Sequence, residues 1–308
     1  MTKRTKKSRI VQKYRKKWKY IITMAPILFF YVLFAIYPNI AVIPMSLYDW
    51  SPIRKSRYFV GLKNFRLMFT VGLEETIKKA GNTMIYIFGL FLIQTILALI
   101  LSLALQKNSR KNKFFRAFFF VPMVFSSTMI SMTWAYMYDP NLGIINNILG
   151  LFGVNGFPGT NLLAVRWQAV LLIVFVHIWA NIGYPITIIT SGLNTISGDL
   201  GEAATIDGAN SWQTFSRITF PLLLPTLFRL SLMTITTGAL AADYIIMIGS
   251  RSASMPYDTW AAAIYKQTMG SIDYGGVSAM AVVMFAFLSI ASLIQFVAMN
   301  KVENKILG

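Results

Sequence analysis

Long apolar stretches, separated by shorter polar segments, dominate the pattern of this chain. Six of them reach the roughly 20 mainly apolar residues that a helix needs to cross a bilayer. They are Tyr20–Tyr48, Gly81–Gln106, Ala117–Tyr138, Trp167–Gly198, Pro221–Ala242 and Tyr274–Asn300. The only charge in any of them is Arg229, which lies near one end of its stretch, where a long side chain reaches the interface. The pattern predicts an all-α polytopic membrane protein with six transmembrane helices.

The polar segments predict the orientation of these helices. Basic residues crowd the N-terminus, residues 107–116 and residues 301–305, and short loops rich in Lys and Arg stay in the cytoplasm. We therefore expect both termini in the cytoplasm and the segment 139–166, with one basic residue, outside. The basic segment 54–79 fits this rule poorly, but the rule weakens as loops lengthen. The acidic segment 199–221, expected inside, needs its own explanation.

The same pattern predicts a single membrane domain. It covers residues 20–300 and contains the polar segment 199–221, with a basic cytoplasmic tail at residues 1–19 and a second tail at residues 301–308. The first apolar stretch is too long for a signal peptide and contains Pro26, Pro38 and Pro44, so we interpret it as a membrane helix.

The amino-acid composition excludes several kinds of binding and catalytic site. The chain is 56% apolar, only 13% charged and has a formal net charge of +18. Ten of its 29 Lys and Arg lie between Lys3 and Lys19, just before an apolar run, which indicates an anchor near anionic lipid rather than a nucleic-acid partner. With no cysteine, one histidine and no Gly-Lys dipeptide, the sequence predicts no disulfide, metal site or Walker A loop. We expect no catalytic residue and no cofactor bound by this chain.

The segment 199–221 is too polar for lipid but has clear helix signals. We predict a first helix that Ser197 or Asp199 caps and that Gly208 ends, followed by a second helix from about Ser211 to Phe220. A carboxylate in the first turn, Glu202, favours the helix dipole. The apolar face of the second helix would carry Trp212, Phe215 and Ile218.

These residues resemble the EAA motif of binding-protein-dependent ABC importer permeases, written E-A-A, three residues, G, nine residues, I-x-L-P. The matching positions are Glu202, Ala203, Ala204, Gly208, Ile218 and Pro221, and Asp207 lies among them. Phe220 replaces the Leu of the motif. The resemblance implies a type I importer fold in which this segment is the coupling helix, docked in a groove of a cytoplasmic ATPase subunit. The alternative is an interfacial helix with a chance EAA triplet.

Further motifs are similar to the carbohydrate-uptake branch, the MalF or UgpA type of permease. They are SLYDW (Ser46–Trp50), FVGLKNF (Phe59–Phe65), GNT (Gly81–Thr83), FFRAFFFVP (Phe114–Pro122), the stretch Trp134–Asn146 with Asp139-Pro140 and Gly143, and YGGVSA (Tyr274–Ala279). The chain departs from that branch after the fifth span, where Ala242-Asp243-Tyr244 and later GSRSASMP replace a Phe-Asp and a Gly-Gly-Pro turn. Arg251 and Lys266, expected on the outer side, would attract an anionic glycan or meet a binding protein.

Polar residues inside the apolar stretches are candidates for a solute path, because such groups are costly against lipid and usually face a bundle interior or a wet cavity. The candidates are His177, Trp179, Asn181, Tyr184, Thr237, Asp243 and Tyr244. Hydrogen bonds between helices are the alternative role for them. We interpret Gln94 and Gln295 as packing contacts. Gly81, Gly183 and Gly238 are expected at close helix contacts, and Pro122 and Pro185 at kinks.

The resemblance implies a permease subunit of an ATP-driven importer in the bacterial cytoplasmic membrane. It would translocate a carbohydrate, most simply an oligosaccharide, delivered by an extracellular solute-binding protein. Its partners would be a second permease subunit in a heterodimer and two ABC ATPase subunits, which use ATP and Mg. The alternatives are an importer permease for another solute, a self-contained six-span channel, or a membrane enzyme.

Overall fold

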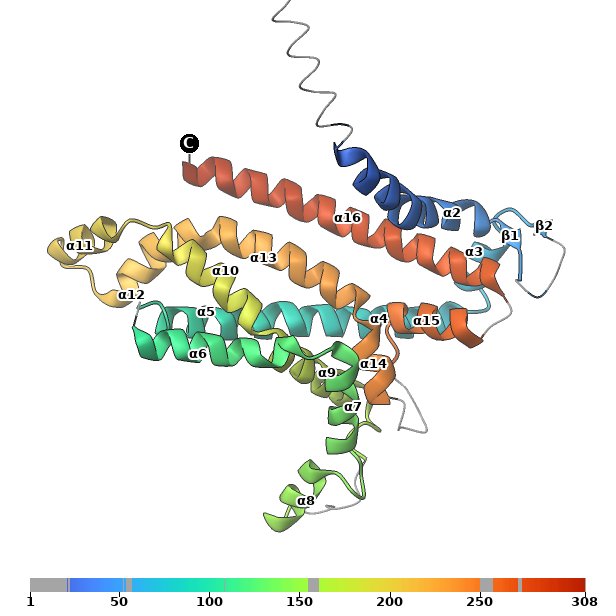
Figure 1. Ribbon diagram of the computed structural model, residues 1–308, viewed down its shortest axis with the longest axis horizontal. Helices are drawn as coiled ribbons and strands as arrows, with labels where there is room; N and C mark the ends of the chain where they lie inside the picture. Colours follow the sequence, from blue (N-terminus) through green and yellow to red (C-terminus); the bar gives the residue numbers. More distant parts are fainter. Residues whose placement is uncertain are drawn as a thin grey trace, which may run out of the picture. The chain divides into compact units, whose positions relative to one another are not determined.

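The computed structural model (Figure 1) describes residues 21, 23–51, 53, 57–107, 109–154, 161–249, 257–270 and 273–307, and most of them are helical. The chain forms two compact units. Unit 1 comprises residues 1–67 and 272–282, and unit 2 comprises residues 68–271 and 283–308. Expectations for the tail 1–19, for Arg251 and for most of the GSRSASMP segment lie outside the described residues.

Four continuous helices are long and apolar enough to cross a membrane: Thr23–Met45, Leu73–Ala104, Ser211–Gly249 and Tyr274–Val302. Two bent pairs pass the same test, namely Arg110–Val124 with Ser127–Met137, bent by 90°, and Arg166–Asn181 with Gly183–Asn194, bent by 58°. If each pair counts as one span, the described residues contain the six spans that the apolar pattern predicts.

Unit 1 joins the first span to a short hairpin and to the beginning of the last helix. Its elements are η1 (Val32–Ile36), α2 (Tyr37–Met45), β1 (Tyr48–Asp49), β2 (Tyr58–Phe59), most of α3 (Lys63–Phe69) and the first turns of α16 (Tyr274–Leu307). The antiparallel pair of two-residue strands was not expected from the apolar pattern, which is silent about so short a hairpin.

Three motifs that the sequence left without a role meet in this unit. Asn64, from FVGLKNF, donates hydrogen bonds from Nδ2 to the carbonyl oxygens of Ser46 (2.8 Å) and Tyr48 (3.1 Å) in SLYDW. The amide of Tyr274, from YGGVSA, donates to the Trp50 carbonyl at 2.9 Å. A Cβ at Gly275 would overlap the Tyr48 carbonyl oxygen. The motifs therefore form one joint between the end of the first span and the start of the last helix.

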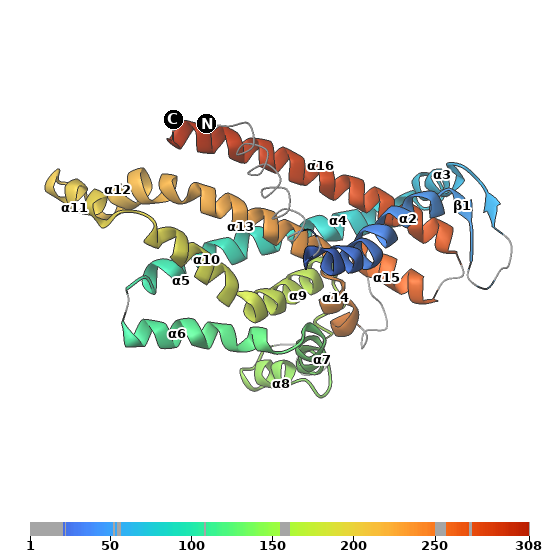
Figure 2. The same cartoon turned by 45° about the horizontal axis from the view of Figure 1, so that its top comes forward.

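Unit 2 contains the remaining elements, most of them helices that run side by side (Figure 2). They are α4 (Leu73–Gly89), η2 (Leu90–Gln94), α5 (Thr95–Ala104), α6 (Arg110–Phe120), η3 (Val121–Val124), α7 (Ser127–Met137), α8 (Ile144–Leu151), α9 (Arg166–Asn181), α10 (Gly183–Asn194), α11 (Gly198–Ile206), α12 (Ser211–Thr214), η4 (Phe215–Thr219), α13 (Phe220–Leu240), α14 (Ala242–Gly249) and α15 (Trp260–Gly270). The second span begins at Leu73, earlier than the predicted Gly81, because the polar first turns of α4 continue the same helix.

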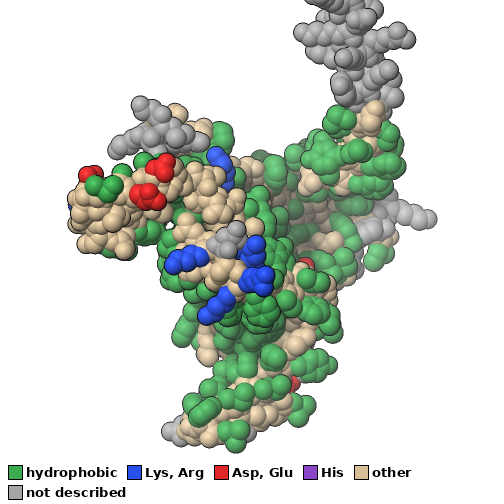
Figure 3. Space-filling view, turned by 60° about the vertical axis from the view of Figure 1, so that its left-hand side comes forward, with side chains coloured by type: hydrophobic (Ala, Val, Ile, Leu, Met, Phe, Trp, Pro, Cys, Tyr) green, Lys and Arg blue, Asp and Glu red, His purple; other side chains and the backbone are tan. Residues whose placement is uncertain are grey.

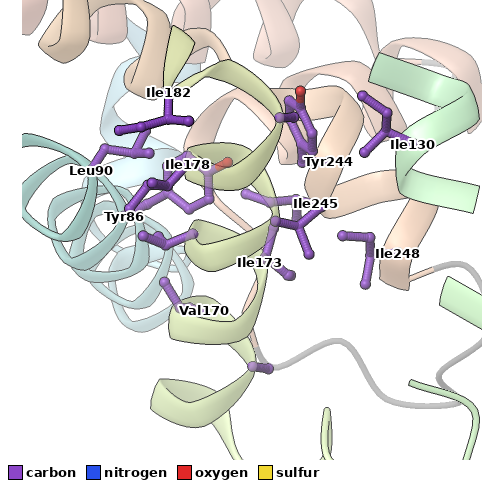
Figure 4. Close-up of a cluster of buried hydrophobic side chains, with 14 of the residues drawn as sticks. Tyr86, Leu90, Ile130, Val170, Ile173, Ile178, Ile182, Tyr244, Ile245 and Ile248 are labelled. Carbon is purple, nitrogen blue, oxygen red and sulfur yellow. The ribbon is translucent and has the colours of Figure 1, made fainter. Parts of the chain in front are cut away.

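The core of unit 2 lies where α4, α9 and α14 meet (Figure 4). Tyr86 and Leu90 come from the second span, Ile173 from α9, and Ile245 and Ile248 from α14, and each is at most 1% exposed. Around this core α7 packs on α14, α10 on α5, and α13 on both α4 and α10. Burial of these apolar side chains fixes the order of the helices.

Glycine and proline set the close contacts and the bends, as predicted. A Cβ on Gly183 would lie 2.7 Å from the Phe119 carbonyl oxygen, so α10 approaches the backbone at the end of α6. Pro122 lies in the 3-10 turn of the 90° bend, and Pro185 lies in the first turn after the 58° bend. Proline removes a backbone donor and therefore favours such breaks.

The GNT motif joins three parts of unit 2. Arg166, at the start of α9, donates from Nε to Oδ1 of Asn82 at 2.6 Å, and Asn82 donates to the carbonyl of Asp258 at 2.9 Å. Thr83 accepts a hydrogen bond from the amide of Trp260 at 2.9 Å. A Cβ at Gly81 would lie 2.9 Å from the Arg166 guanidinium. Each residue of the motif thus contributes to a polar joint between α4, α9 and α15.

Candidate functional site

The segment between the fourth and fifth spans, which we call the elbow (residues 198–219), begins as the EAA pattern predicts. Ser197 caps α11, and its side chain accepts a hydrogen bond from the amide of Asp199. The helix ends in a Schellman motif: the amide of Gly208 donates to Thr205 at 3.1 Å, and that of Ala209 donates to Ala204 at 2.9 Å. Gly208 has a φ of +81°, so the glycine of the motif occupies the left-handed position that such a cap requires.

The second half of the elbow differs from the prediction. Its helix does not stop at Pro221, because Ser211–Gly249 is one continuous helix that includes the π turn η4. Pro221 therefore lies inside a continuous helix, shortly after the π turn, and its missing backbone donor leaves one helical hydrogen bond unmade. Sequence reasoning also missed the capping box of Asn210 and Gln213, whose side chains each accept a hydrogen bond from the other residue's amide, although the N-x-x-Q spacing was present.

The surface of the elbow combines apolar and acidic side chains. Ile206 is 86% exposed and Trp212 71% exposed, and the carboxylates of Glu202 and Asp207 are also on the surface. Figure 3 shows acidic side chains gathered on the elbow, separate from a group of basic side chains. Ala203 is exposed, Ala204 is buried inside the elbow, and Ile218 and Pro221 are half-buried at its base. A protruding helical pair with bare apolar side chains and local negative charge suits docking into a groove of another protein.

A cavity of about 520 Å³ lies between the spans of unit 2. Five elements line it: η2, η3, α9, α10 and α13. Its lining residues are Gln94, Met123, His177, Asn181, Tyr184, Pro185, Leu230, Leu232, Met233, Thr234, Thr236 and Thr237. Most of this lining surface is apolar, and the polar groups on it are amides, hydroxyls and one imidazole; none of the described lining residues is Asp, Glu, Lys or Arg.

His177 holds one wall of this cavity in place. Its Nδ1 lies 2.9 Å from the Tyr86 hydroxyl, and its ring stacks on Tyr244 with centroids 4.6 Å apart. Asn181 donates hydrogen bonds to the His177 carbonyl and to the Tyr244 hydroxyl, both at 3.0 Å. Four side chains from α4, α9 and α14 thus form one connected group, and two of them, His177 and Asn181, reach the cavity.

The predicted solute-path residues divide into two sets. His177, Asn181, Tyr184 and Thr237 line the cavity. The other three are not among its lining residues: the Trp179 ring packs against Trp134 at 5.6 Å, Asp243 accepts a hydrogen bond from Ser127 at 2.7 Å, and Tyr244 is buried behind His177. Trp179 lies two residues from both His177 and Asn181 and so projects from another side of α9, whereas Asp243 and Tyr244 belong to a separate helix, α14. Lys266 pairs with Asp258 at 2.6 Å, and its role toward a glycan or a binding protein stays a prediction.

One lining residue was not among the solute-path candidates from the sequence. Gln94 was interpreted as a packing contact, but it lies on the cavity wall and none of the hydrogen bonds found among the described residues involves its side chain. Gln295 does make packing contacts, donating to the Phe228 carbonyl at 3.2 Å and to Ser231. Within the described ranges, no group of three or more His, Asp or Glu side chains could hold a metal ion.

The chain matches a protein-family model over residues 94–303, which include the elbow and every residue that lines the cavity. The family is described as "Binding-protein-dependent transport system inner membrane component".

Curated relatives match along almost the whole chain. The multiple sugar-binding transport system permease protein MsmF of Streptococcus mutans is 28% identical over 288 residues, covering 94% of this chain and 97% of its own. The sn-glycerol-3-phosphate transport system permease protein UgpA of Salmonella typhimurium is 27% identical over 297 residues, covering 95% of this chain and 97% of its own.

Two solved structures share the fold. A bacterial ABC transporter for import of the acidic polysaccharide alginate contains a chain with a TM-score of 0.81 and 19% identity, covering 95% of this chain and 99% of that one. A bacterial alginate ABC transporter bound to its pentasaccharide-loaded periplasmic protein gives a TM-score of 0.78 at 19% identity, covering 97% and 98%.

Proposed function

The chain belongs to the family of binding-protein-dependent transport system inner membrane components, and from this premise we propose that it is the permease subunit of an ATP-driven importer that carries a saccharide through the cavity between its spans. The family match is the observation that carries this proposal. The name of MsmF and the titles of the alginate transporters support a saccharide as the solute. The name of UgpA makes a phosphorylated polyol the competing solute.

The cavity supports a solute path. Amides, hydroxyls and an imidazole inside membrane spans are costly unless they face one another or a wet space. Here His177, Asn181, Tyr184, Thr234 and Thr237 line one space of about 520 Å³, the size of a small-molecule site. Hydroxyl and amide groups bind the hydroxyls of a sugar, and the Tyr184 ring offers an apolar face to its C–H surface.

The elbow supports coupling to a separate motor. Exposed Ile206 and Trp212, with Glu202 and Asp207 beside them, would dock in a groove of an ATPase subunit on the cytoplasmic side. The helix Ser211–Gly249 begins at the elbow and passes the cavity, which its residues 230–237 line. A force on the elbow therefore acts directly on a cavity wall. Closure of the ATPase pair would favour one access state of the cavity and hydrolysis would release that bias.

The proposed assembly contains more than this chain. A second permease subunit completes the pathway as a heterodimer, two ATPase subunits bind ATP and Mg and hydrolyse the nucleotide, and an extracellular binding protein delivers the solute. This chain itself has no catalytic role in the scheme, and both of its termini lie in the cytoplasm.

Copurification and uptake test the proposal. The chain is expressed with its partner permease, ATPase and binding protein, and uptake of radiolabelled sucrose, maltose, raffinose and glycerol 3-phosphate is measured in cells. We expect uptake of a saccharide, and we expect Glu202→Lys and Gly208→Asp to abolish both ATPase copurification and uptake while membrane insertion persists. Glu75→Lys, a charge reversal on the exposed first turn of α4, is the matched control and keeps both.

Two outcomes would contradict the proposal. Uptake that persists in cells without the ATPase would indicate a self-contained channel. Uptake of glycerol 3-phosphate and of none of the sugars would remove the saccharide assignment and leave only an importer permease.

A further inference from the structure

Gln94 differs from Gln295, a second glutamine in the apolar spans of unit 2. It is only 6% exposed and lines the cavity, yet none of the hydrogen bonds among the described residues involves its amide group. Gln295, by contrast, donates to the Phe228 carbonyl and to the Ser231 hydroxyl. The amide atoms of Gln94 are not among the fully buried polar atoms that lack a partner, so they keep contact with the cavity and need a hydrogen-bond partner there. Such a group is tolerated where a ligand or cavity water takes the partner's place.

The backbone directs Gln94 into the cavity. It is the last residue of the π turn Leu90–Gln94, which interrupts the second span between α4 and α5. A π turn inserts an extra residue into a helix and rotates the side chains after it, and such turns are frequent at functional sites. The other end of this turn, Leu90, is fully buried in the core. The turn thus keeps the Leu90 side chain in the apolar core while the Gln94 side chain lies on the wall of the cavity.

The surroundings of Gln94 define the chemistry it can recognise. The lining also includes Thr234 and Thr237 on α13, whose hydroxyls donate to carbonyl oxygens of their own helix and can still accept, and the His177 and Asn181 side chains on α9. Because none of the described lining residues is Asp, Glu, Lys or Arg, they offer no formal charge to pair with a carboxylate or a phosphate. An amide places one acceptor and two donors side by side, which matches neighbouring hydroxyl groups that each donate and accept.

We propose that the Gln94 amide contacts the transported solute and selects a neutral part of a saccharide by hydrogen bonds to adjacent hydroxyl groups. This inference rests on the proposed importer function and deepens it. Gln94 is then a specificity-determining residue, and the solute class is narrowed from saccharides in general to those with an uncharged hydroxyl-bearing ring in the cavity.

The test measures how strongly each variant prefers a sugar over its monodeoxy analogues. Absolute uptake would not suffice, because the binding protein also selects the solute. The assembled transporter is reconstituted in liposomes with saturating binding protein, and uptake of a transported sugar among sucrose, maltose and raffinose is compared with uptake of its monodeoxy analogues. The ratio of parent to analogue is measured for the native chain, for Gln94→Met, which keeps the length of the side chain, and for Gln295→Met as matched control. Selection by the binding protein cancels when ratios are compared between variants.

We expect Gln94→Met to lower the ratio about fivefold for at least one hydroxyl position, in keeping with one lost neutral hydrogen bond, while Gln295→Met leaves every ratio unchanged. Unchanged ratios for Gln94→Met with uptake retained would overturn the assignment. If Gln94→Met fails to insert, Gln94→Asn decides: a shorter amide should change the pattern of preferred analogues, and an unaltered pattern would overturn the assignment too. A native chain that takes up none of these saccharides would instead remove the saccharide assignment of the proposed function, on which this inference rests.

Discussion

Gly208 and Gly201 belong to the same part of the elbow but differ in backbone conformation. Gly208 has a φ of +81°, whereas Gly201 lies within α11 at an ordinary helical position. A Cβ added at either glycine would meet nothing within 4 Å. The glycine of the EAA pattern is therefore needed for its backbone and not for space.

We predict that Gly208→Ala weakens the elbow by about 1–2 kcal/mol, because an L-residue is strained in the left-handed region. The Ala209 amide, which donates to Ala204 across the cap, should lose protection in hydrogen exchange, and uptake should fall. Gly201→Ala serves as the control. Equal protection of Ala209 in both variants would show that the cap does not depend on glycine.

Asn82 contributes to stability through buried hydrogen bonds. It is 1% exposed, accepts a hydrogen bond from Arg166 and donates one to the Asp258 carbonyl. We predict that Asn82→Ala destabilises the chain by about 2–3 kcal/mol, because the substitution removes a charge-assisted hydrogen bond and leaves a carbonyl without that donor. A lower unfolding temperature in detergent checks this.

Asn112→Ala is the comparison for Asn82→Ala. Its side chain makes only a local, exposed hydrogen bond to the Lys107 carbonyl, so its unfolding temperature should stay close to that of the native chain. If both variants unfold at the same temperature, the hydrogen bonds of Asn82 in the GNT motif stabilise the chain no more than an exposed local hydrogen bond does.

At the scale of elements, the bend between α9 and α10 decides which residues reach the cavity. It lies at Ile182, between Asn181 and Gly183, and turns the chain by 58°. His177 before the bend and Tyr184 after it both line the cavity, while Trp179 points elsewhere. The bend is stabilised by the contact of Gly183 with the backbone of Phe119 and Phe120.

We predict that Gly183→Ala separates α10 from the end of α6 and destabilises the chain by about 1–3 kcal/mol, because a backbone carbonyl cannot move aside as a side chain can. The unfolding temperature and the rate of uptake should both decrease. Gly198→Ala, where an added Cβ meets nothing within 4 Å, should leave stability unchanged. A native-like unfolding temperature for Gly183→Ala would mean that the two helices are not in tight contact.

At the scale of the whole molecule, the proposed orientation places the elbow in the cytoplasm and the segment after α7 outside. The chain has no cysteine, so single cysteines report the side of the membrane without background. We predict that Ser211→Cys reacts with a membrane-impermeant maleimide only in inside-out vesicles, and that Leu142→Cys, at a 79% exposed position, reacts only in intact spheroplasts. Reaction of Ser211→Cys from the outside would refute coupling to a cytoplasmic motor.

The sequence by itself determined the features that depend on local chemistry. Long apolar stretches predict spans because the bilayer offers no partners to backbone groups, and the six predicted stretches correspond to four continuous helices and two bent pairs. The residues Ser197 to Gly208 predict a capped helix and a left-handed turn because both are settled within a few residues of chain. The family resemblance followed from the same local spacing and is confirmed by the family match.

Only the tertiary structure decided which polar residues share a space. Gln94, His177 and Thr237 lie far apart in the chain and line the same cavity. The π turn of the second span and the bend at Ile182 bring them there, and neither break produces a periodic pattern in the sequence. For the same reason Asp243 and Tyr244 look like cavity residues in the sequence, but Asp243 bonds to Ser127 and Tyr244 packs behind His177. Contacts between distant segments depend on how helices pack, and packing is set by the summed fit of many side chains rather than by any one of them.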